Sequence, residues 1–186
     1  MNSRVIALII AFAAVTVVLN PRFSGIAIPS FLPSLWFQIW EIAIVTAFFL
    51  LGMKSAVVIA LLNTAVLQAV SPGAPYGQPL ANLVGVLSTL LGVYVAYKLS
   101  ERTSLQETTL PRRKLVLSST TLGLTCRLLI MMPFLYAVAL FLGMSTVIIM
   151  FPLFVLYDLI VALYTVPLGY LVATVVNKSV KLNAKI

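Results

Sequence analysis

Arg127 lies in an almost wholly apolar stretch, TCRLLIMMPFLY (125–136), and is the one charged residue between Lys114 and Asp158. A charge in such a segment is costly in lipid, and ionisable residues there usually pair, face the interior of a helix bundle or mark a site. Glu41 and Asp158 lie in other apolar segments and are the candidate partners. The sequence therefore predicts either a polar cavity that contains Arg127 or an ion pair that joins two neighbouring helices.

The chain offers little for catalysis. It has no histidine and one cysteine, Cys126, so the common general base is missing and no disulfide can form within one chain. It also lacks the G-x-x-x-x-G-K-[ST] pattern that holds nucleotide phosphates. These absences count against an intramembrane hydrolase or metalloprotease and against ATP hydrolysis by this chain. We expect a protein that is not an enzyme and needs no cofactor.

Composition places these residues in a membrane protein. Of the 186 residues 62% are hydrophobic and 9% are charged, against roughly 25% charged in soluble domains. A spanning helix needs about 20 mainly apolar residues. The segment after Arg4 resembles a signal peptide without a clear cleavage site, so we expect it to be retained as a first helix. We predict an all-α, single six-helix transmembrane domain over 1–186, with spans near 4–19, 35–53, 55–70, 80–98, 114–140 and 150–176.

The basic residues predict the orientation of these spans. With the N-terminus inside, the inner segments hold ten of them: Arg4, Lys54, Lys98, Arg102, Arg112, Arg113, Lys114, Lys178, Lys181 and Lys185. The outer loops, 20–34, 71–79 and 141–149, hold only Arg22. Cytoplasmic loops carry the excess of Lys and Arg. We therefore expect a multi-pass cell-membrane protein with both termini cytoplasmic; five or seven spans would break this alternation.

Polar residues gather near the outer ends of the predicted spans. At a rise of 1.5 Å per residue, Glu41 and Asp158 each lie about 9 Å below the outer face. Arg127, Gln68 and Asn82 fall near the same level. The sequence thus predicts a polar layer in an outward-facing cavity, and the apolar loop 20–34 is a candidate lid.

Aromatic residues crowd the same side of the predicted bundle. Phe31, Trp36, Tyr76 and Tyr136 are among them. They fit either an aromatic belt at the membrane interface or a stacking pocket for a small planar ligand. On the first predicted helix Ala7, Ala11 and Ala14 form a stripe of small residues, which lets another helix approach closely. That helix belongs either to this chain or to a partner.

Several segments together resemble a known family. These are IPSFLPSLWFQIWEIAIVTAFFLLGMKSAVVIALLNTAVL (28–67), GQPLANLVG (77–85), CRLLIMM (126–132), FPLFVLYDLIVAL (151–163) and Ala7-x-x-x-Ala11. They resemble the substrate-binding S component of energy-coupling factor (ECF) vitamin transporters, closest to the riboflavin-binding branch. Gln78 stands at that family's Glu position, Asn82 at its Asn, and Asp158 at its sixth-helix Asn. Val161 replaces the family's Lys, and the late Asn-Tyr pair of helix five is not present as such.

The resemblance implies a function. An S component binds riboflavin or a related vitamin from outside, with the first loop as a lid. It then docks through the Ala motif on a transmembrane coupling subunit that carries two ATPase subunits, and no nucleic acid is involved. The ligand-binding candidates from the residues and the resemblance together are Phe31, Trp36, Gln38, Glu41, Asn63, Gln68, Tyr76, Asn82, Arg127, Met131, Tyr136 and Asp158; the docking candidates are Ala7, Ala11 and Ala14.

Two other readings of the sequence stay open. One is a structural or assembly subunit of a membrane complex with no small-molecule ligand, in which Arg127 only joins two helices. The other is a standalone ion-coupled carrier that uses Glu41, Arg127 and Asp158 as a relay. Such carriers often contain inverted repeats, and residues 1–93 and 94–186 show no convincing match.

Overall fold

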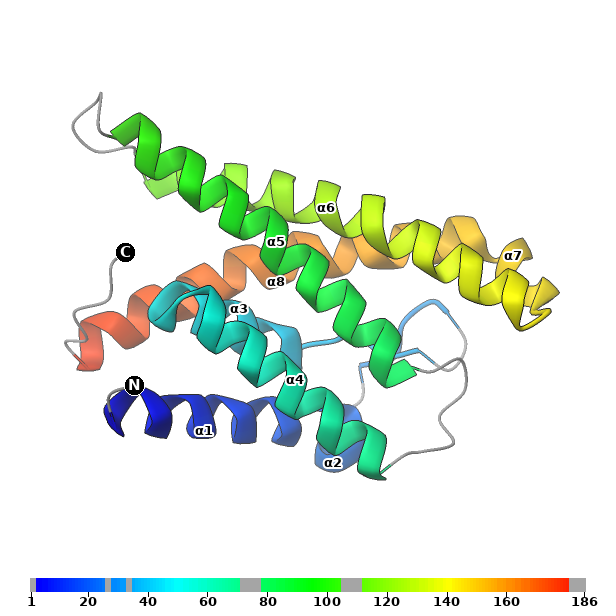
Figure 1. Ribbon diagram of the computed structural model, residues 1–186, viewed down its shortest axis with the longest axis horizontal. Helices are drawn as coiled ribbons and strands as arrows, with labels where there is room; N and C mark the ends of the chain where they lie inside the picture. The colour runs from blue at the N-terminus through cyan, green and yellow to red at the C-terminus, as the bar shows by residue number, and fades with distance from the viewer. Residues whose placement is uncertain (1–2, 26–27, 33–34, 71–77, 105–111, 181–186) are drawn as a thin grey trace. The chain divides into compact units, whose positions relative to one another are not determined.

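The computed structural model describes residues 3–25, 28–32, 35–70, 78–104 and 112–180. Within these ranges the chain is almost entirely helical, with a single isolated antiparallel bridge between Pro29 and Trp36. The helices, shown in Figure 1, are α1 (Ser3–Val18), α2 (Pro21–Ser24), α3 (Trp40–Leu51), α4 (Met53–Val70), α5 (Gln78–Ser104), α6 (Arg112–Phe141), α7 (Ser145–Ile149) and α8 (Phe151–Val180). The expected all-α class is confirmed for this part of the chain.

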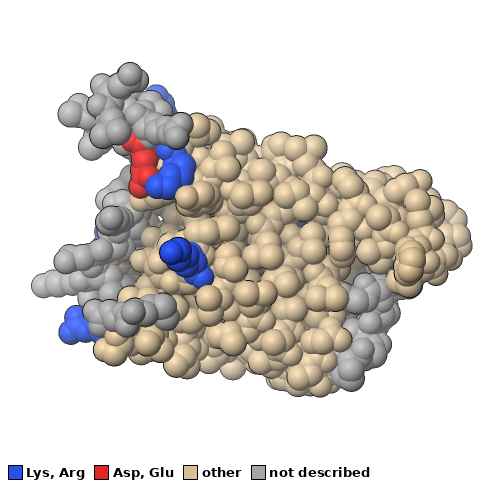
Figure 2. Space-filling view, in the orientation of Figure 1, with Lys and Arg blue, Asp and Glu red and all other residues tan. Residues whose placement is uncertain are grey.

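Within the described ranges, four helices are long and apolar enough to cross a membrane: α4, α5, α6 and α8. Helices α1 and α3 are apolar but shorter. The face drawn in Figure 2 is uncharged apart from a few side chains, as expected of a surface that meets lipid. The chain is a multi-pass membrane protein. The count of six spans and the cytoplasmic placement of both termini stay predictions.

The predicted start of the second span, at residue 35, is wrong. Helix α3 begins at Trp40 and has 12 residues, which makes it about 18 Å long at 1.5 Å per residue. The residues before it are extended: the backbone N–H of Phe37 donates to the carbonyl of Ile28 over 2.9 Å, and that of Ser30 donates to Leu35 over 3.2 Å. Because these hydrogen bonds already satisfy the backbone N–H and C=O groups, the segment does not have to be helical. Glu41 is therefore in the first turn of α3, and not six residues inside a helix.

The contacts divide the chain into two compact units, and α5 and α8 run from one into the other. The first unit comprises residues 1–83 and 168–186. In it α1, α3 and α4 pack against one another, and α3 is buried along almost its whole length. Thr46 Oγ1 donates to the carbonyl of Gly169 on α8 over 3.2 Å. A Cβ on Gly169 would lie 2.7 Å from Val45 Cγ1, so glycine is needed for this close approach.

The second unit comprises residues 84–167. Its α5 and α6 approach so closely at Gly92 that a Cβ there would overlap the backbone of Leu122. Helix α6 ends at Phe141, Gly143 turns the chain at φ 66°, and the short α7 follows before α8. The connection from the fifth to the sixth predicted span therefore contains a short helix. That 1–186 act as a single domain stays a prediction.

Candidate functional site

The loop after α1 begins with a capped turn in the first unit. The side-chain Oδ1 of Asn20 accepts a hydrogen bond from the backbone N–H of Arg22 over 3.1 Å. Pro21 occupies the first position of α2, where its missing N–H and fixed φ are favourable. Gly25 ends this short helix at φ 66°, a conformation that glycine adopts without strain. The turn brings the side chains of Asn20 and Arg22 to the pocket described below.

The loop continues as two extended segments that pair through the bridge between Pro29 and Trp36. The rings of Phe31 and Phe37 lie edge to face with centroids 6.5 Å apart. Because side chains alternate along an extended segment, Trp36 and Gln38 fall on the same side, and Trp40 follows at the start of α3. These three residues form one wall of a pocket.

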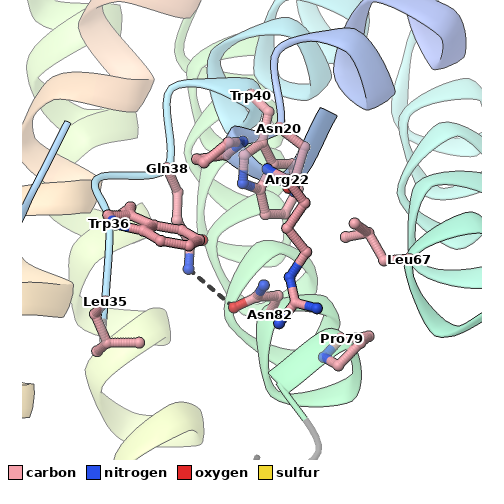
Figure 3. A pocket seen from close by; sticks show the side chains of 10 residues that line it. Asn20, Arg22, Leu35, Trp36, Gln38, Trp40, Leu67, Pro79 and Asn82 are labelled. Atoms are coloured by element: carbon pink, nitrogen blue, oxygen red, sulfur yellow. Dashed lines mark hydrogen bonds between the residues drawn. The ribbon is translucent and has the colours of Figure 1, made fainter. Parts of the chain in front are cut away.

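The pocket, shown in Figure 3, lies wholly within the first unit. Its volume is about 50 Å³. Among the described residues, its lining combines aromatic, aliphatic, amide and guanidinium groups and includes no carboxylate. The lining residues are Asn20, Pro21, Arg22, Leu35, Trp36, Gln38, Trp40, Leu67, Pro79 and Asn82.

Two amide side chains meet at this pocket. Gln38 Nε2 donates to Asn82 Oδ1 over 2.9 Å, which joins the loop before α3 to the first turns of α5. Gln38 is 9% exposed. Its Oε1 is buried and has no hydrogen-bond partner among the residues that the structure describes. Gln38 thus carries a buried acceptor that has no partner in the described part of the chain, a group that is costly to bury.

A second polar centre lies in the other unit. Arg127 Nε donates to Asp158 Oδ1 over 2.7 Å, and Arg127 Nη1 donates to Thr89 Oγ1 over 3.2 Å. Thr89 in turn donates to the carbonyl of Gly85 over 3.0 Å. A Cβ on Gly85 would lie 3.1 Å from Arg127 Nη2, so this glycine leaves room for the guanidinium. Arg127 and Asp158 are 1% and 4% exposed. Of the two predicted partners of Arg127, Asp158 is the one with which the structure shows an ion pair.

The predicted ligand-binding residues do not form one cluster in the structure. Trp36, Gln38 and Asn82 line the pocket, and Arg127 and Asp158 form the buried pair. Tyr76 is outside the described residues, as is the side chain of Gln78. Among the others, Glu41, Asn63 and Met131 are buried, whereas Phe31, Gln68 and Tyr136 are exposed. That they bind a ligand stays a prediction.

Asn63 and the alanine stripe each have a distinct setting. Asn63 on α4 is 1% exposed, and neither atom of its amide group has a partner within the described part of the chain. On α1 the side chains of Ala7, Ala11 and Ala14 are all exposed. Of the two readings of this stripe, packing within the chain therefore receives no support from the described residues.

Sequence reasoning missed several residues that surround these centres. Arg22 was recognised only as the cation of the outer loops, and Thr89 and Gly85 were not singled out. Asn20 directly before Pro21 is a typical start signal of a helix, and it was the available clue that the loop turns there. No group of three or more His, Cys, Asp and Glu side chains that could hold a metal ion occurs in the described ranges.

Comparison with known proteins gives one informative result. No family model matches the chain, and no curated protein matches it. Among solved structures, the chain is similar to one described as "Structure and mechanism of the S component of a bacterial ECF transporter". The TM-score is 0.77 at 20% sequence identity, over 97% of this chain and 99% of that one. At this identity the likeness establishes the fold, and the chain has the fold of that S component.

Proposed function

We propose that the chain is the high-affinity substrate-binding subunit of an ECF-type vitamin uptake transporter and that it binds riboflavin from outside. The observation that carries this proposal is the fold, which matches that of an S component over nearly the full length of both chains. The quoted sequence segments that resemble the riboflavin-binding branch support it independently of the coordinates.

The pocket in the first unit supports a binding function. A few polar groups set among aromatic and aliphatic side chains are typical of sites for small organic ligands. The volume of about 50 Å³ is far below the roughly 300–1,000 Å³ of such sites. A vitamin can therefore enter only if a wall of the pocket moves. The loop between α2 and α3 supplies Leu35, Trp36 and Gln38 to that wall, and we assign it the role of a lid.

Transport by such a subunit needs partners. The sequence has no phosphate-binding loop of the ATPase type, and we propose that the energy comes from a transmembrane coupling subunit with two ATPase subunits. The exposed face of α1 with Ala7, Ala11 and Ala14 is the proposed contact, because small residues allow close helix packing in lipid. Both termini are proposed to be cytoplasmic.

Binding in detergent tests this function. The protein purified without ATP and without an ion gradient should carry riboflavin, seen as a yellow preparation with a flavin absorption spectrum, or should take it up at a stoichiometry near one. A standalone carrier with an ion relay would instead bind in a pH-dependent manner. A structural subunit would bind neither riboflavin nor any other vitamin in a screen, and that result would refute the proposal.

A further inference from the structure

The end of the first unit at which α1 and α4 begin is basic. Arg4 lies in the first turn of α1, Lys54 in the first turn of α4, and Lys178 in the last turn of α8. All three side chains are exposed. We call these three residues the basic end of the unit. Figure 1 shows the starts of α1 and α4 and the end of α8 toward the same end.

Contacts between α3 and α8 within the unit agree with this placement. Thr46 of α3 donates to the carbonyl of Gly169, and the rings of Phe49 and Tyr170 lie edge to face with centroids 5.2 Å apart. Because the later residue of α3 contacts the later residue of α8, the two helices run in the same direction. The end of α3, where α4 follows, and the end of α8 therefore lie on the same side of these contacts.

The unit offers no acidic side chain at its basic end. Glu41 is the one acidic residue in 1–83 and 168–186. It is 1% exposed and lies in the first turn of α3, at the other end of that helix from Lys54. Among the described residues, neither Lys54 nor Lys178 has an ion pair. These two lysines therefore carry positive charge that the unit leaves unbalanced.

The place of the two lysines at the ends of apolar helices indicates which anion reaches them. Lys54 follows the apolar α3, and Lys178 ends the apolar α8. A lysine stem lies along apolar surface while its ammonium group extends to the level of the lipid headgroups. The predicted orientation puts this end at the cytoplasmic leaflet, which carries anionic lipids, and each basic residue near such a surface strengthens association about fivefold.

We infer that the basic end binds the headgroups of anionic phospholipids, with the ammonium groups of Lys54 and Lys178 donating to phosphate oxygens. The inference goes beyond the proposed function, because none of the three basic residues lines the pocket. It names a second kind of ligand for the chain, a membrane lipid selected by its charge. Because the lysines are exposed, salt should weaken the selection.

Quenching by labelled lipids tests this inference close to the lysines. In a Cys126→Ser background, Ser179→Cys places a fluorophore at the basic end, and Val70→Cys places one at the far end of α4; both replaced side chains at 179 and 70 are exposed. Phosphatidylcholine vesicles receive equal small amounts of nitroxide-labelled phosphatidylglycerol or phosphatidylcholine. At residue 179 the phosphatidylglycerol should associate about tenfold or more strongly than the phosphatidylcholine. At residue 70 this preference should be clearly smaller.

Charge variants then assign the preference to the two lysines. Lys54→Gln with Lys178→Gln should lower it by about fivefold or more. Lys54→Arg with Lys178→Arg keeps both charges and should retain it. Lys98→Gln is the matched control, because Lys98 is also an exposed lysine but pairs with Glu101 over 2.8 Å. This control should leave the preference at residue 179 unchanged.

Three results would overturn the inference. Equal association of the two lipids at residue 179 would leave an acidic surface of a partner protein as the better occupant of the basic end. An unchanged preference in the double Gln variant would show that the two lysines do not select the lipid. Displacement of phosphatidylglycerol by inorganic phosphate, beyond that by chloride at equal ionic strength, would indicate a site for free anions. Vitamin binding is measured separately, so none of these results bears on the proposed function.

Discussion

Arg127 and Asp158, on α6 and α8, form an ion pair with Nε and Oδ1 2.7 Å apart, and both side chains are almost wholly buried. Thr89 accepts a further hydrogen bond from the guanidinium. Neither charged residue lines the pocket of the other unit. The carboxylate of Asp158 and the hydroxyl of Thr89 both accept hydrogen bonds from the guanidinium of Arg127. A link between α6 and α8 is therefore enough to explain an arginine in an apolar segment.

Asp158→Asn should lower the thermal stability of the purified protein strongly. Removing one partner of a buried ion pair leaves an uncompensated charge, at a cost of about 3–5 kcal/mol. The measurement is the midpoint of thermal unfolding in detergent. Replacing both partners, Arg127→Met with Asp158→Leu, should recover most of the loss. A single variant that unfolds like the unmodified protein but binds riboflavin more than tenfold more weakly would instead place Asp158 in the ligand site.

Two glycines of α5 should differ in their tolerance of alanine. At Gly92 a Cβ would overlap the backbone of Leu122, whereas at Gly85 it would meet the side chain of Arg127 at 3.1 Å. A side chain can shift more easily than a helix backbone. Gly92→Ala should therefore lower the unfolding midpoint more than Gly85→Ala, with overpacking costs of about 1–3 kcal/mol or more. The reverse order would show that α5 and α6 do not approach as described.

Bulky residues on the exposed face of α1 should separate transport from binding. Ala7→Leu with Ala11→Leu fills the stripe proposed to contact the coupling subunit, so uptake of radiolabelled riboflavin by cells should be abolished. Binding in detergent should be unchanged, because these side chains are exposed and do not line the pocket. Ala65→Leu, at an exposed alanine of α4, is the matched control and should transport normally. Loss of binding in the double variant would contradict a docking role.

Labelling of single cysteines should show which side of the membrane each loop faces. In a Cys126→Ser background, a membrane-impermeant maleimide should label Phe23→Cys in intact cells. Lys54→Cys and Lys178→Cys should react only after permeabilisation, as the distribution of basic residues predicts. All three replaced side chains are exposed. Labelling of either lysine position from outside would disprove the predicted orientation.

Most helix bounds could be predicted from the sequence because apolar length and flanking charges mark them. The span expected at 114–140 is α6, Arg112–Phe141. The start of α3 could not be predicted because Leu35, Trp36 and Phe37 are as apolar as the residues of a spanning helix, and hydropathy does not distinguish an apolar extended segment from a helical one. What decides the matter is pairing with residues 28–30, a contact with no local signal.

The contacts within the candidate sites also have little local signal in the sequence. The sequence predicts a carboxylate partner for Arg127, because ionisable residues inside a membrane usually pair. It leaves Asp158 and Glu41 as alternatives, and only the packing of the helices selects between them. Gln38 and Asn82 were both named, but their hydrogen bond joins residues 44 positions apart, and neutral amides give no comparable signal. The sequence does not assign Arg22 to the site, because a basic residue in an outer loop is expected to be solvated. The turn at Asn20, which brings Arg22 to the pocket, is seen only in the structure.

The most direct measurement is a fluorescence-quench titration of the detergent-purified protein with riboflavin, without ATP or an ion gradient. We expect saturable quenching of the two pocket tryptophans with a stoichiometry near one. A colourless preparation that shows no saturable quenching would exclude riboflavin. If a screen of other vitamins also gave no binding, the substrate-binding function itself would be contradicted, and a structural subunit would be the better reading of this fold.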